Sequence, residues 1–389
     1  MIKSVSRRRW IIRIIYCLFF IQAGSWFSLF GLFLQRNGLT GLQTGIILAI
    51  FPTTMLLFMP FWGIVADRYG KKRTLLFTAI LTSLSYVVFV FSIGFWNFFL
   101  CTFLVALFYN PTMNSLLDSI TLDYIETQKG INFGSFRVWG SIGYASGGLI
   151  AGRLMSLMVM KYIFVIAGLL LMAGWILLLF FKNEERVEQN AEKQKTNYIK
   201  IIFFDKKIAG FLALCIFIGI TIQSVWGFQT TYLSSIGASN QMIGFSIMLQ
   251  AISELPFYPI SYFIIKRIGL VRGMSLSILF TAIRLALYGT VSNPFFAVLI
   301  ELLQGFSFIL TIIAAVEFLN HSVPKQWRAT GQSLFASSYY GVGAIIGYWW
   351  AGYLIDKFDI QKMFLINAVI ILVVFLFSLK LKNVKYESG

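Results

Sequence analysis

Four charged side chains stand inside stretches of the sequence that are otherwise almost entirely apolar. They are Asp118, Arg137, Glu254 and Arg284. An ionised side chain at the centre of a hydrocarbon layer costs at least about 2.5–3.5 kcal/mol, so each of these charges requires a partner or a function. Carboxylates and guanidinium groups in such surroundings form ion pairs and hydrogen-bond polar solutes, and the carboxylates can also take up and release protons.

The depth of these charges along their apolar stretches predicts two ion pairs. At about 1.5 Å per residue of helix, Asp118 and Arg137 both lie roughly 6–9 Å from the inner end of their stretches. By the same count Glu254 and Arg284 both lie roughly 15–17 Å deep, which is near the middle of the layer. A further carboxylate, Glu301, falls within about two turns of an outer end, where we expect it to reach water.

Polar residues that recur every four positions accompany two of the carboxylates. They are Asn110, Asn114 and Asp118 in one stretch, and Gln250, Glu254 and Tyr258 in another. Side chains four residues apart lie on one face of a helix, so each set predicts a polar stripe that suits a wet cavity. The competing interpretation is that the asparagines and glutamines form hydrogen bonds between helices, worth about 0.6 kcal/mol each. Tyr144 follows Arg137 by seven residues on the same face, a combination that suits a hydroxylated ring.

The elements that position these side chains are predicted to be membrane-spanning helices. The chain of 389 residues is 58% hydrophobic and only 12% charged, against about 25% charged in a soluble domain. Lipid offers the backbone no hydrogen-bond partner and the apolar runs lack the alternation of a barrel, so we predict an all-α polytopic membrane protein. Its twelve predicted spans, each long enough for a hydrocarbon core of about 30 Å, are 10–34, 42–66, 74–93, 97–124, 133–157, 160–181, 208–232, 242–264, 273–291, 294–320, 332–355 and 362–381.

Basic residues are distributed unevenly about these spans. Most of the 32 lysines and arginines lie on one side, which the positive-inside rule assigns to the cytoplasm, and both termini fall on that side. The net charge of +17 therefore predicts topology and not a nucleic-acid surface. We expect a bacterial cytoplasmic-membrane protein with a retained first span, because no cleavage site follows its apolar core. The three cysteines fall inside spans without a His/Cys cluster, so we expect neither disulfides nor metal ligands.

The chain repeats itself at an offset of 199 or 200 residues. The matched pairs include Gly38 with Gly237, Gly70 with Gly269, Gly143 with Gly343, and Gly147 with Gly347. One offset that extends from the second span to the eleventh predicts two copies of six helices, residues 1–181 and 208–389. The long polar segment between them, 182–207, is predicted to be a cytoplasmic linker. Parallel copies of this kind are the layout of transporters that alternate access around a midplane site.

The segment "GIVADRYGKKR" at 63–73 resembles the signature loop between the second and third spans of the major facilitator superfamily. The residues that match are Gly63, Asp67, Arg68, Gly70, Lys71 and Arg73. The resemblance implies that these residues form a cytoplasmic gate that locks the ends of neighbouring helices in one state. The alternative is a basic turn that only sets topology, and the two roles are compatible.

A second resemblance is to the fifth span of the lactose permease and its relatives, carried by "FGSFRVWGSIGYA" at 133–145. It implies that Arg137 binds substrate together with Asp118, while Tyr144 stands where that permease has a tryptophan. The segments "ISELPFY" and "TAIRLALYG" resemble the eighth and ninth spans of the nucleoside/proton symporters and the phenylpropionate transporters, at Glu254 and Arg284. The predicted substrate-binding residues are thus Asp118, Arg137, Tyr144, Asn110, Asn114, Gln250 and Gln304.

The tenth span departs from the lactose permease, because Gln304 and Ser307 stand where that permease couples protons through a histidine and a glutamate. If protons drive this protein, a carboxylate must carry them. We predict that Glu254 is the first choice and Asp118 the second. Burial would favour the protonated form of Glu254, and Arg284 would favour its ionised form, so proton binding and solute binding could be coupled. The expected partners are therefore a small solute, protons and the lipid bilayer, for a monomer that needs no cofactor. No phosphate-binding loop is present, so ATP is not the expected energy source.

Three alternatives compete with a proton-coupled importer of a sugar, nucleoside or aromatic acid. The first is a proton-coupled exporter of drugs or metabolites, although no proline follows Gly152 as in the antiporter signature. The second is a membrane enzyme such as a prenyltransferase, which requires clustered aspartates. Here only Asp118 and Asp123 come near each other, and at five residues apart they share a helical face poorly. The third is a nutrient sensor, for which we expect a long soluble extension that this chain lacks.

Overall fold

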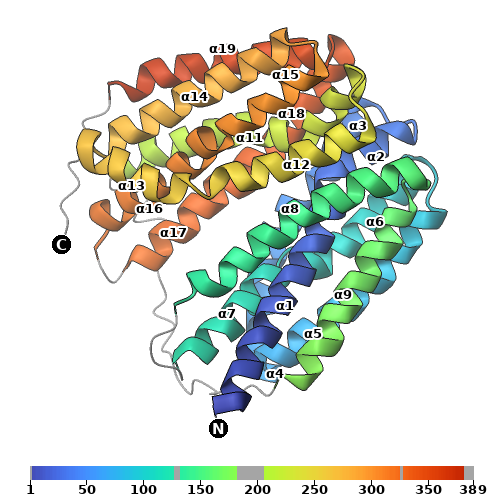
Figure 1. Cartoon of the computed structure of the whole chain (residues 1–389). Helices are drawn as coiled ribbons and strands as arrows, with labels where there is room; N and C mark the ends of the chain where they lie inside the picture. The colour runs from blue at the N-terminus through green and yellow to red at the C-terminus, as the bar shows by residue number, and fades with distance from the viewer. Residues whose placement is uncertain (1, 127–131, 182–205, 325–326, 381–389) are drawn as a thin grey trace. The chain divides into compact units, whose positions relative to one another are not determined.

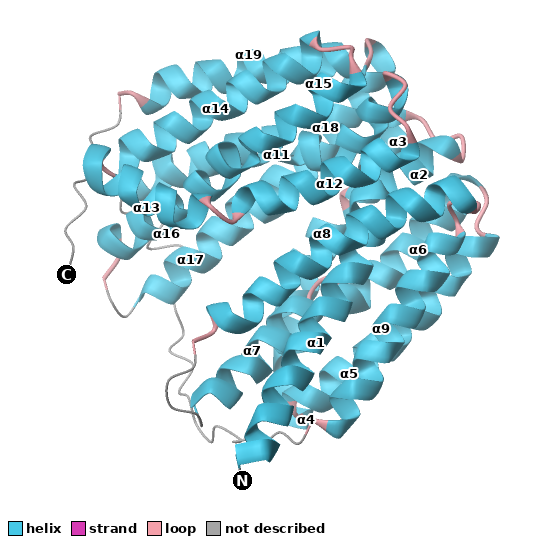
Figure 2. Cartoon of the chain, viewed as in Figure 1, coloured by secondary structure: helices cyan, strands magenta, loops and turns pink. Residues whose placement is uncertain are grey.

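The computed structural model describes residues 2–126, 132–181, 206–324 and 327–380, and within these ranges the chain is built of helices without strands (Figures 1 and 2). In that part of the chain nine helices or joined helical runs are long and apolar enough to cross a membrane. These nine coincide with nine of the twelve predicted spans. The prediction of an all-α polytopic membrane protein is therefore confirmed.

The first half of the sequence forms helices α1 to α9. They are α1 (Ile2–Trp26), η1 (Phe27–Leu29), α2 (Phe30–Arg36), α3 (Gly41–Leu48), α4 (Ile50–Tyr69), α5 (Lys71–Val88), η2 (Phe89–Phe91), α6 (Gly94–Tyr109), α7 (Met113–Glu126), α8 (Gly134–Leu157) and α9 (Tyr162–Phe180). Within this group α8 packs along α1, and α9 packs on both α1 and α5.

The second half forms the helices from α11 to α19. They are α11 (Lys206–Ser235), α12 (Asn240–Glu254), α13 (Phe257–Ile268), α14 (Leu270–Thr290), α15 (Pro294–Leu299), η3 (Ile300–Leu303), η4 (Gly305–Ile309), α16 (Leu310–Ser322), α17 (Arg328–Ala336), η6 (Ser337–Val342), α18 (Gly343–Lys357) and α19 (Ile360–Ser378). Here α18 packs along α11, the counterpart of α8 along α1, and α14 runs beside α19 (Figure 1).

The three remaining predicted spans are less apolar for a visible reason. They correspond to α8, to α12 with α13, and to α17 with η6 and α18, helical elements that carry glycines and polar side chains. Arg137 lies in α8, and Glu254 is the last residue of α12. Two of these three less apolar spans, α8 and α12, thus contain charged residues that the sequence analysis identified, Arg137 and Glu254.

Several predicted spans are interrupted helices. A proline cannot donate a backbone hydrogen bond, and the chain leaves α-helical geometry next to Pro111, between α6 and α7, and next to Pro256, between α12 and α13. The tenth predicted span is the short helix α15, the 3-10 segment η3, the π-helix η4 and then α16. Wide π turns of this kind occur often at functional sites, and this one lies next to Glu301 and Gln304.

The backbone carries the internal repeat that the sequence predicts. Gly38 and Gly237 have φ values of 85° and 86°, and Gly70 and Gly269 have φ values of 96° and 90°. These angles lie in the left-handed region that glycine alone occupies without steric cost. Equivalent turns in the two copies therefore use glycine for the same conformational reason.

Glycines also permit the equivalent helix pairs to approach closely. A methyl group on Gly143 of α8 would lie 2.5 Å from the carbonyl oxygen of Cys17 in α1, and one on Gly347 of α18 would lie 2.5 Å from that of Ile220 in α11. Backbone atoms cannot move aside as a flexible side chain can, so such a contact would be a steric clash. Both helix pairs therefore require glycine at these positions.

The chain divides into two compact units, each of which takes in a short segment from the opposite half of the sequence. The first unit is Met1–Leu39, Ile50–Asn190 and Ser239–Ile252, and the second is Thr40–Ala49, Ala191–Ala238 and Ser253–Gly389. The two short segments, 40–49 and 239–252, begin 199 residues apart, the offset of the repeat. Most of the predicted linker, residues 182–205, lies outside the described residues.

Each short segment is held in its unit by close contacts with a helix of that unit. In the first unit Gly244 of α12 packs against Gly148 and Gly152 of α8. In the second unit the carboxylate of Asp356 in α18 accepts hydrogen bonds from the backbone N–H groups of Gly41 (2.6 Å) and Leu42 (2.8 Å) at the start of α3. A carboxylate in this position satisfies free N–H groups and complements the helix dipole.

Replacing Gly347 with alanine is expected to destabilise the protein, because the new methyl group meets the backbone of α11. Overpacking of this kind costs about 1–3 kcal/mol. The matched control is Gly210→Ala in α11, where a methyl group would meet nothing within 4 Å. Thermal unfolding of the purified protein, followed by tryptophan fluorescence, should show a lower midpoint for G347A alone. Equal midpoints for the two variants would contradict the packing argument.

Candidate functional site

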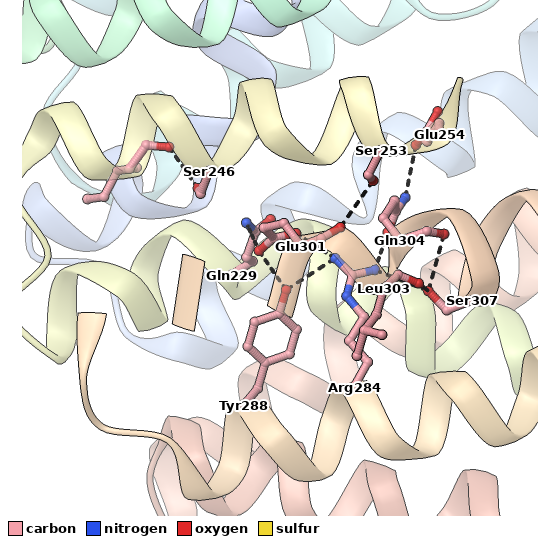
Figure 3. Close-up of polar contacts among 11 residues, drawn as sticks. Gln229, Ser246, Ser253, Glu254, Arg284, Tyr288, Glu301, Leu303, Gln304 and Ser307 are labelled. Carbon is pink, nitrogen blue, oxygen red and sulfur yellow. Dashed lines mark hydrogen bonds and ion pairs between the residues drawn. The ribbon is translucent and has the colours of Figure 1, made fainter. Parts of the chain in front are cut away.

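The most deeply buried charges in the described part of the chain form an ion pair in the second unit (Figure 3). Arg284 Nη2 in α14 lies 2.7 Å from Glu301 Oε2 in η3, and the two side chains are 1% and 0% exposed. Two charges without water require good geometry and further hydrogen bonds to offset their desolvation. The structure supplies both.

Three other residues complete the hydrogen bonding of Glu301. The Tyr288 hydroxyl donates to Glu301 Oε1 at 2.6 Å, and Gln229 Nε2 in α11 donates to the same oxygen. Ser253 Oγ in α12 donates to the backbone carbonyl of Glu301 at 3.1 Å. Tyr288 also accepts a hydrogen bond from Arg284 Nη2 at 3.1 Å, so the ion pair and the phenol form a closed triangle (Figure 3).

Gln304 joins this ion pair to Glu254. Arg284 Nη1 donates to Gln304 Oε1, and Gln304 Nε2 donates to Glu254 Oε1 at 3.1 Å. Because a guanidinium group can only donate, it fixes the amide with its oxygen toward Arg284 and its nitrogen toward Glu254. Arg284 Nε is buried and makes no hydrogen bond within the described residues.

Two expectations for this cluster are wrong. Arg284 pairs directly with Glu301 and not with Glu254, and Glu301 is fully buried instead of reaching water. The tenth predicted span is interrupted at this point, and Glu301 lies in its 3-10 segment, where a depth counted along a regular α-helix does not apply. The spacing of Glu301 and Gln304 by three residues, opposite Arg284 and Tyr288 spaced by four, was the signal that could have revealed the cluster.

In the first unit Asp118 and Arg137 lie near each other without a direct bond. The Tyr16 hydroxyl in α1 donates to Asp118 Oδ1 at 2.6 Å. The guanidinium carbon of Arg137 lies 4.4 Å from the centroid of the Phe20 ring, within range of a cation–π interaction. Among the described residues Arg137 makes no ion pair with Asp118, so the predicted direct pair is wrong, although the two charges remain within electrostatic range. Arg137 is exposed and Asp118 half-buried, so both are accessible to a solute.

The other predicted binding residues differ in how they are held. The hydroxyl groups of Tyr144 and Ser28 lie 2.5 Å apart. Asn110 Nδ2 donates to the carbonyl oxygen of Phe51 at 2.8 Å, which is the bond between helices that the competing interpretation describes. Asn114 is exposed and Gln250 is buried. Only Gln304 among them lies in the network of Arg284.

A buried network around Gln22 was missed by the sequence analysis. Gln22 Nε2 donates to the Tyr109 hydroxyl at 2.8 Å, while its Oε1 accepts from Trp26 Nε1 at 3.0 Å and from the Tyr86 hydroxyl at 3.2 Å. One amide thus satisfies three aromatic polar groups from three helices. Its only signal in the sequence is a lone glutamine within an apolar run, which does not indicate its partners.

The predicted gate loop joins α4 to α5 through Gly70. Lys71 Nζ lies 2.9 Å and 2.8 Å from the two carboxylate oxygens of Asp123 in α7, so the loop is tied to a neighbouring helix end. The guanidinium of Arg68 lies over the ring of Tyr69 at 5.6 Å. Through the part of the chain that the structure describes, no group of three or more His, Cys, Asp or Glu side chains is placed to hold a metal ion.

Comparison with known proteins places this geometry among transporters. A model of the family described as the MFS_1 like family matches residues 9–366. The maltose permease of Geobacillus stearothermophilus is 24% identical over 388 residues, covering 99% of this chain and 98% of the permease. The sucrose permease of Escherichia coli is 25% identical over 388 residues, covering 95% of this chain and 92% of the permease.

A solved structure gives the same result for the fold. The crystal structure of the nucleoside transporter NupG aligns with a TM-score of 0.86 at 22% identity, covering 96% of this chain and all of that chain. At this identity the likeness concerns the fold alone. The matched proteins are transporters and not enzymes, which excludes the prenyltransferase alternative.

Replacing Gln22 with leucine is expected to lower stability, because it leaves three buried hydroxyl or indole groups without their partner. An unsatisfied buried polar group costs about 1–3 kcal/mol. Asn114→Leu is the matched control, since Asn114 is exposed. Thermal unfolding in detergent should give a clearly lower midpoint for Q22L and an unchanged midpoint for N114L; similar midpoints would remove the structural role assigned to Gln22.

Proposed function

Because the chain belongs to the MFS_1 like family and is a multi-pass membrane transporter, we propose that it takes up a small polar organic solute together with protons. The proposed solute is a sugar, a nucleoside or an aromatic acid. The observation that carries the proposal is the half-buried Glu254 at the end of α12, joined through Gln304 to a sealed charge pair. A carboxylate in this position can gain or lose a proton while it keeps its hydrogen bond to Gln304.

The solute is proposed to bind first at Arg137. An exposed guanidinium beside Phe20, with the Asp118 carboxylate nearby, offers donors, an acceptor and an aromatic face within one unit. A hydroxylated ring presents hydroxyl groups at its edge, which can hydrogen-bond the guanidinium and the carboxylate. Its apolar face can pack against the aromatic ring. The maltose and sucrose permeases and the nucleoside transporter NupG are named for solutes of this class. Tyr144, Asn110, Asn114, Gln250 and Gln304 are proposed as further contacts.

The proposed cycle is alternating access, in which residues 1–181 rock against residues 208–389. In each unit helices meet at glycines, which lets them approach and slide. The residues 63–73 are proposed to lock the cytoplasmic ends in one state, and the tie between Lys71 and Asp123 supports this role. We further propose a monomer in a bacterial cytoplasmic membrane with both termini in the cytoplasm, from the distribution of lysine and arginine.

Reconstituted liposomes test the direction and the coupling. The protein is inserted into vesicles that report internal and external pH, and sucrose, maltose, uridine and 3-phenylpropionate are added one at a time. Uptake with alkalinisation of the outside is the expected result for one class of solute. Empty liposomes and a heat-inactivated preparation are the controls. No proton movement with any solute, combined with pH-driven efflux of ethidium, would replace import by export.

The Arg137 site is tested by Arg137→Lys. Lysine keeps the charge but loses the planar fork of donors and stacks less well on Phe20. For the solute identified above we expect the KM of uptake to rise by about tenfold or more, which corresponds to about 1.4 kcal/mol of binding free energy. Arg153→Lys, at the far end of the same helix, is the control and should leave KM unchanged. An unchanged KM for R137K would exclude Arg137 from the binding site.

A further inference from the structure

We propose that Arg9 and Arg13 of α1 form a second binding station for the solute, near the N-terminal end of that helix, and that the solute is an anion. In the proposed orientation this end lies at the cytoplasm, so the station receives the solute after it leaves Arg137. The proposal rests on the proposed uptake and deepens it, because it selects a carboxylate-bearing solute, such as an aromatic acid, from the three proposed classes.

One face of α1 connects the two arginines to the proposed solute site. Four of its residues follow one another at intervals of four, three and four positions, and we call them the α1 stripe: Arg9, Arg13, Tyr16 and Phe20. Side chains at these intervals lie on one face of a helix. Tyr16 on this face donates a hydrogen bond to Asp118 at 2.6 Å. Phe20 lies under the guanidinium of Arg137. The stripe therefore begins at the end of the helix and leads to the solute site.

The stripe and the site to which it leads carry more positive than negative charge. Their cations are Arg9, Arg13 and Arg137, and the one carboxylate that the stripe contacts within the described residues is Asp118. None of the three arginines forms an ion pair with another residue in the part of the chain that the structure describes. Two positive charges thus remain along this face. Surfaces of one sign concentrate solutes of the opposite sign, so the stripe suits an anion.

Arg13 is held with its hydrogen-bond donors available. Its guanidinium carbon lies 5.0 Å from the centroid of the Trp10 ring and 5.8 Å from that of Phe136 in α8. Trp10 is itself packed edge-on against Trp139, at 5.5 Å between centroids. Cation–π contacts use the faces of a guanidinium group and leave the N–H groups at its edge for a carboxylate. The Nε atoms of Arg9 and Arg13 are buried and make no hydrogen bond within the described ranges, so both can donate to a ligand.

Basic residues at the inner end of a span also set topology, but that role does not explain the position of Arg13. It lies inside the first predicted span, 10–34, and on the same face as Phe20. The two residues are seven positions apart, which is about 10 Å of helix. A charge inside a span requires a partner or a function, and this spacing suits two successive stations for one small solute.

Equilibrium binding tests the charge of the solute. The protein is placed in nanodiscs of phosphatidylcholine, which has no net charge, and three pairs of probes that differ by an anionic group are compared. They are 3-phenylpropionate with 3-phenylpropionamide, glucuronate with glucose, and uridine 5′-monophosphate with uridine. In one pair the charged member should bind about tenfold more tightly or better. If no charged probe binds more tightly than its neutral partner, the inference is overturned, although uptake of a neutral solute remains open.

Transport measured from each side of the membrane tests the position of the station. For the anion identified, Arg13→Gln and Arg9→Gln should each raise the KM from the cytoplasmic side by about fivefold, the effect of one lost ion pair, and leave the KM from the outer side unchanged. Arg137→Lys should raise both. Arg13→Lys keeps the charge and should stay near the wild type. Arg153→Gln, toward the far end of α8, is the control and should change neither KM.

A wild-type cytoplasmic KM in both R9Q and R13Q would overturn the station. An effect that appears only in vesicles containing phosphatidylglycerol would also overturn it, because the arginines would then bind a lipid headgroup. Binding in nanodiscs requires neither transport nor a proton gradient. If the wild type binds an anion through Arg13 but moves no protons with it, the proposed coupling fails and the station does not, so the two failures are distinguishable.

Discussion

The ion pair between Arg284 and Glu301 is the interaction around which the polar network of the second unit is built. Its charges are the most completely buried in the described chain, and the side chains that hydrogen-bond to them are Gln229, Tyr288, Gln304 and Ser307. Gln304 also connects Arg284 to Glu254. A pair of this kind adds little stability compared with apolar residues of the same size, because desolvation offsets most of the attraction. Its presence therefore indicates a role beyond holding helices together.

The internal repeat explains how the same scaffold carries two different sites. Equivalent glycines bring α8 onto α1 and α18 onto α11 at equivalent positions, and equivalent left-handed glycines end the corresponding turns. On this common frame the first unit places exposed and half-buried charges beside aromatic rings, while the second seals its charges and leaves one carboxylate half-buried. The division suits a protein that binds a solute in one place and a proton in another.

The sequence predicted the spans and the repeat well because both depend on patterns that extend over many residues. Hydropathy over about 20 residues identifies a span regardless of its neighbours, and a constant offset identifies a repeat. The pairing of Arg284 was not predictable in this way. Counting 1.5 Å per residue assumes a regular α-helix, and Glu301 lies in the 3-10 segment Ile300–Leu303, where the rise per residue is larger. The partners of Gln22 were equally hidden, because Tyr86 and Tyr109 come from two other helices whose rotation the sequence does not specify.

The central claim is that uptake of the solute is coupled to protons, and the reversal potential of transport measures the ratio of protons to solute most directly. Liposomes are loaded with a known solute gradient, and the opposing proton gradient that stops net flux is determined. A ratio of at least one proton per solute is the result that the account predicts. A ratio of zero would contradict proton coupling.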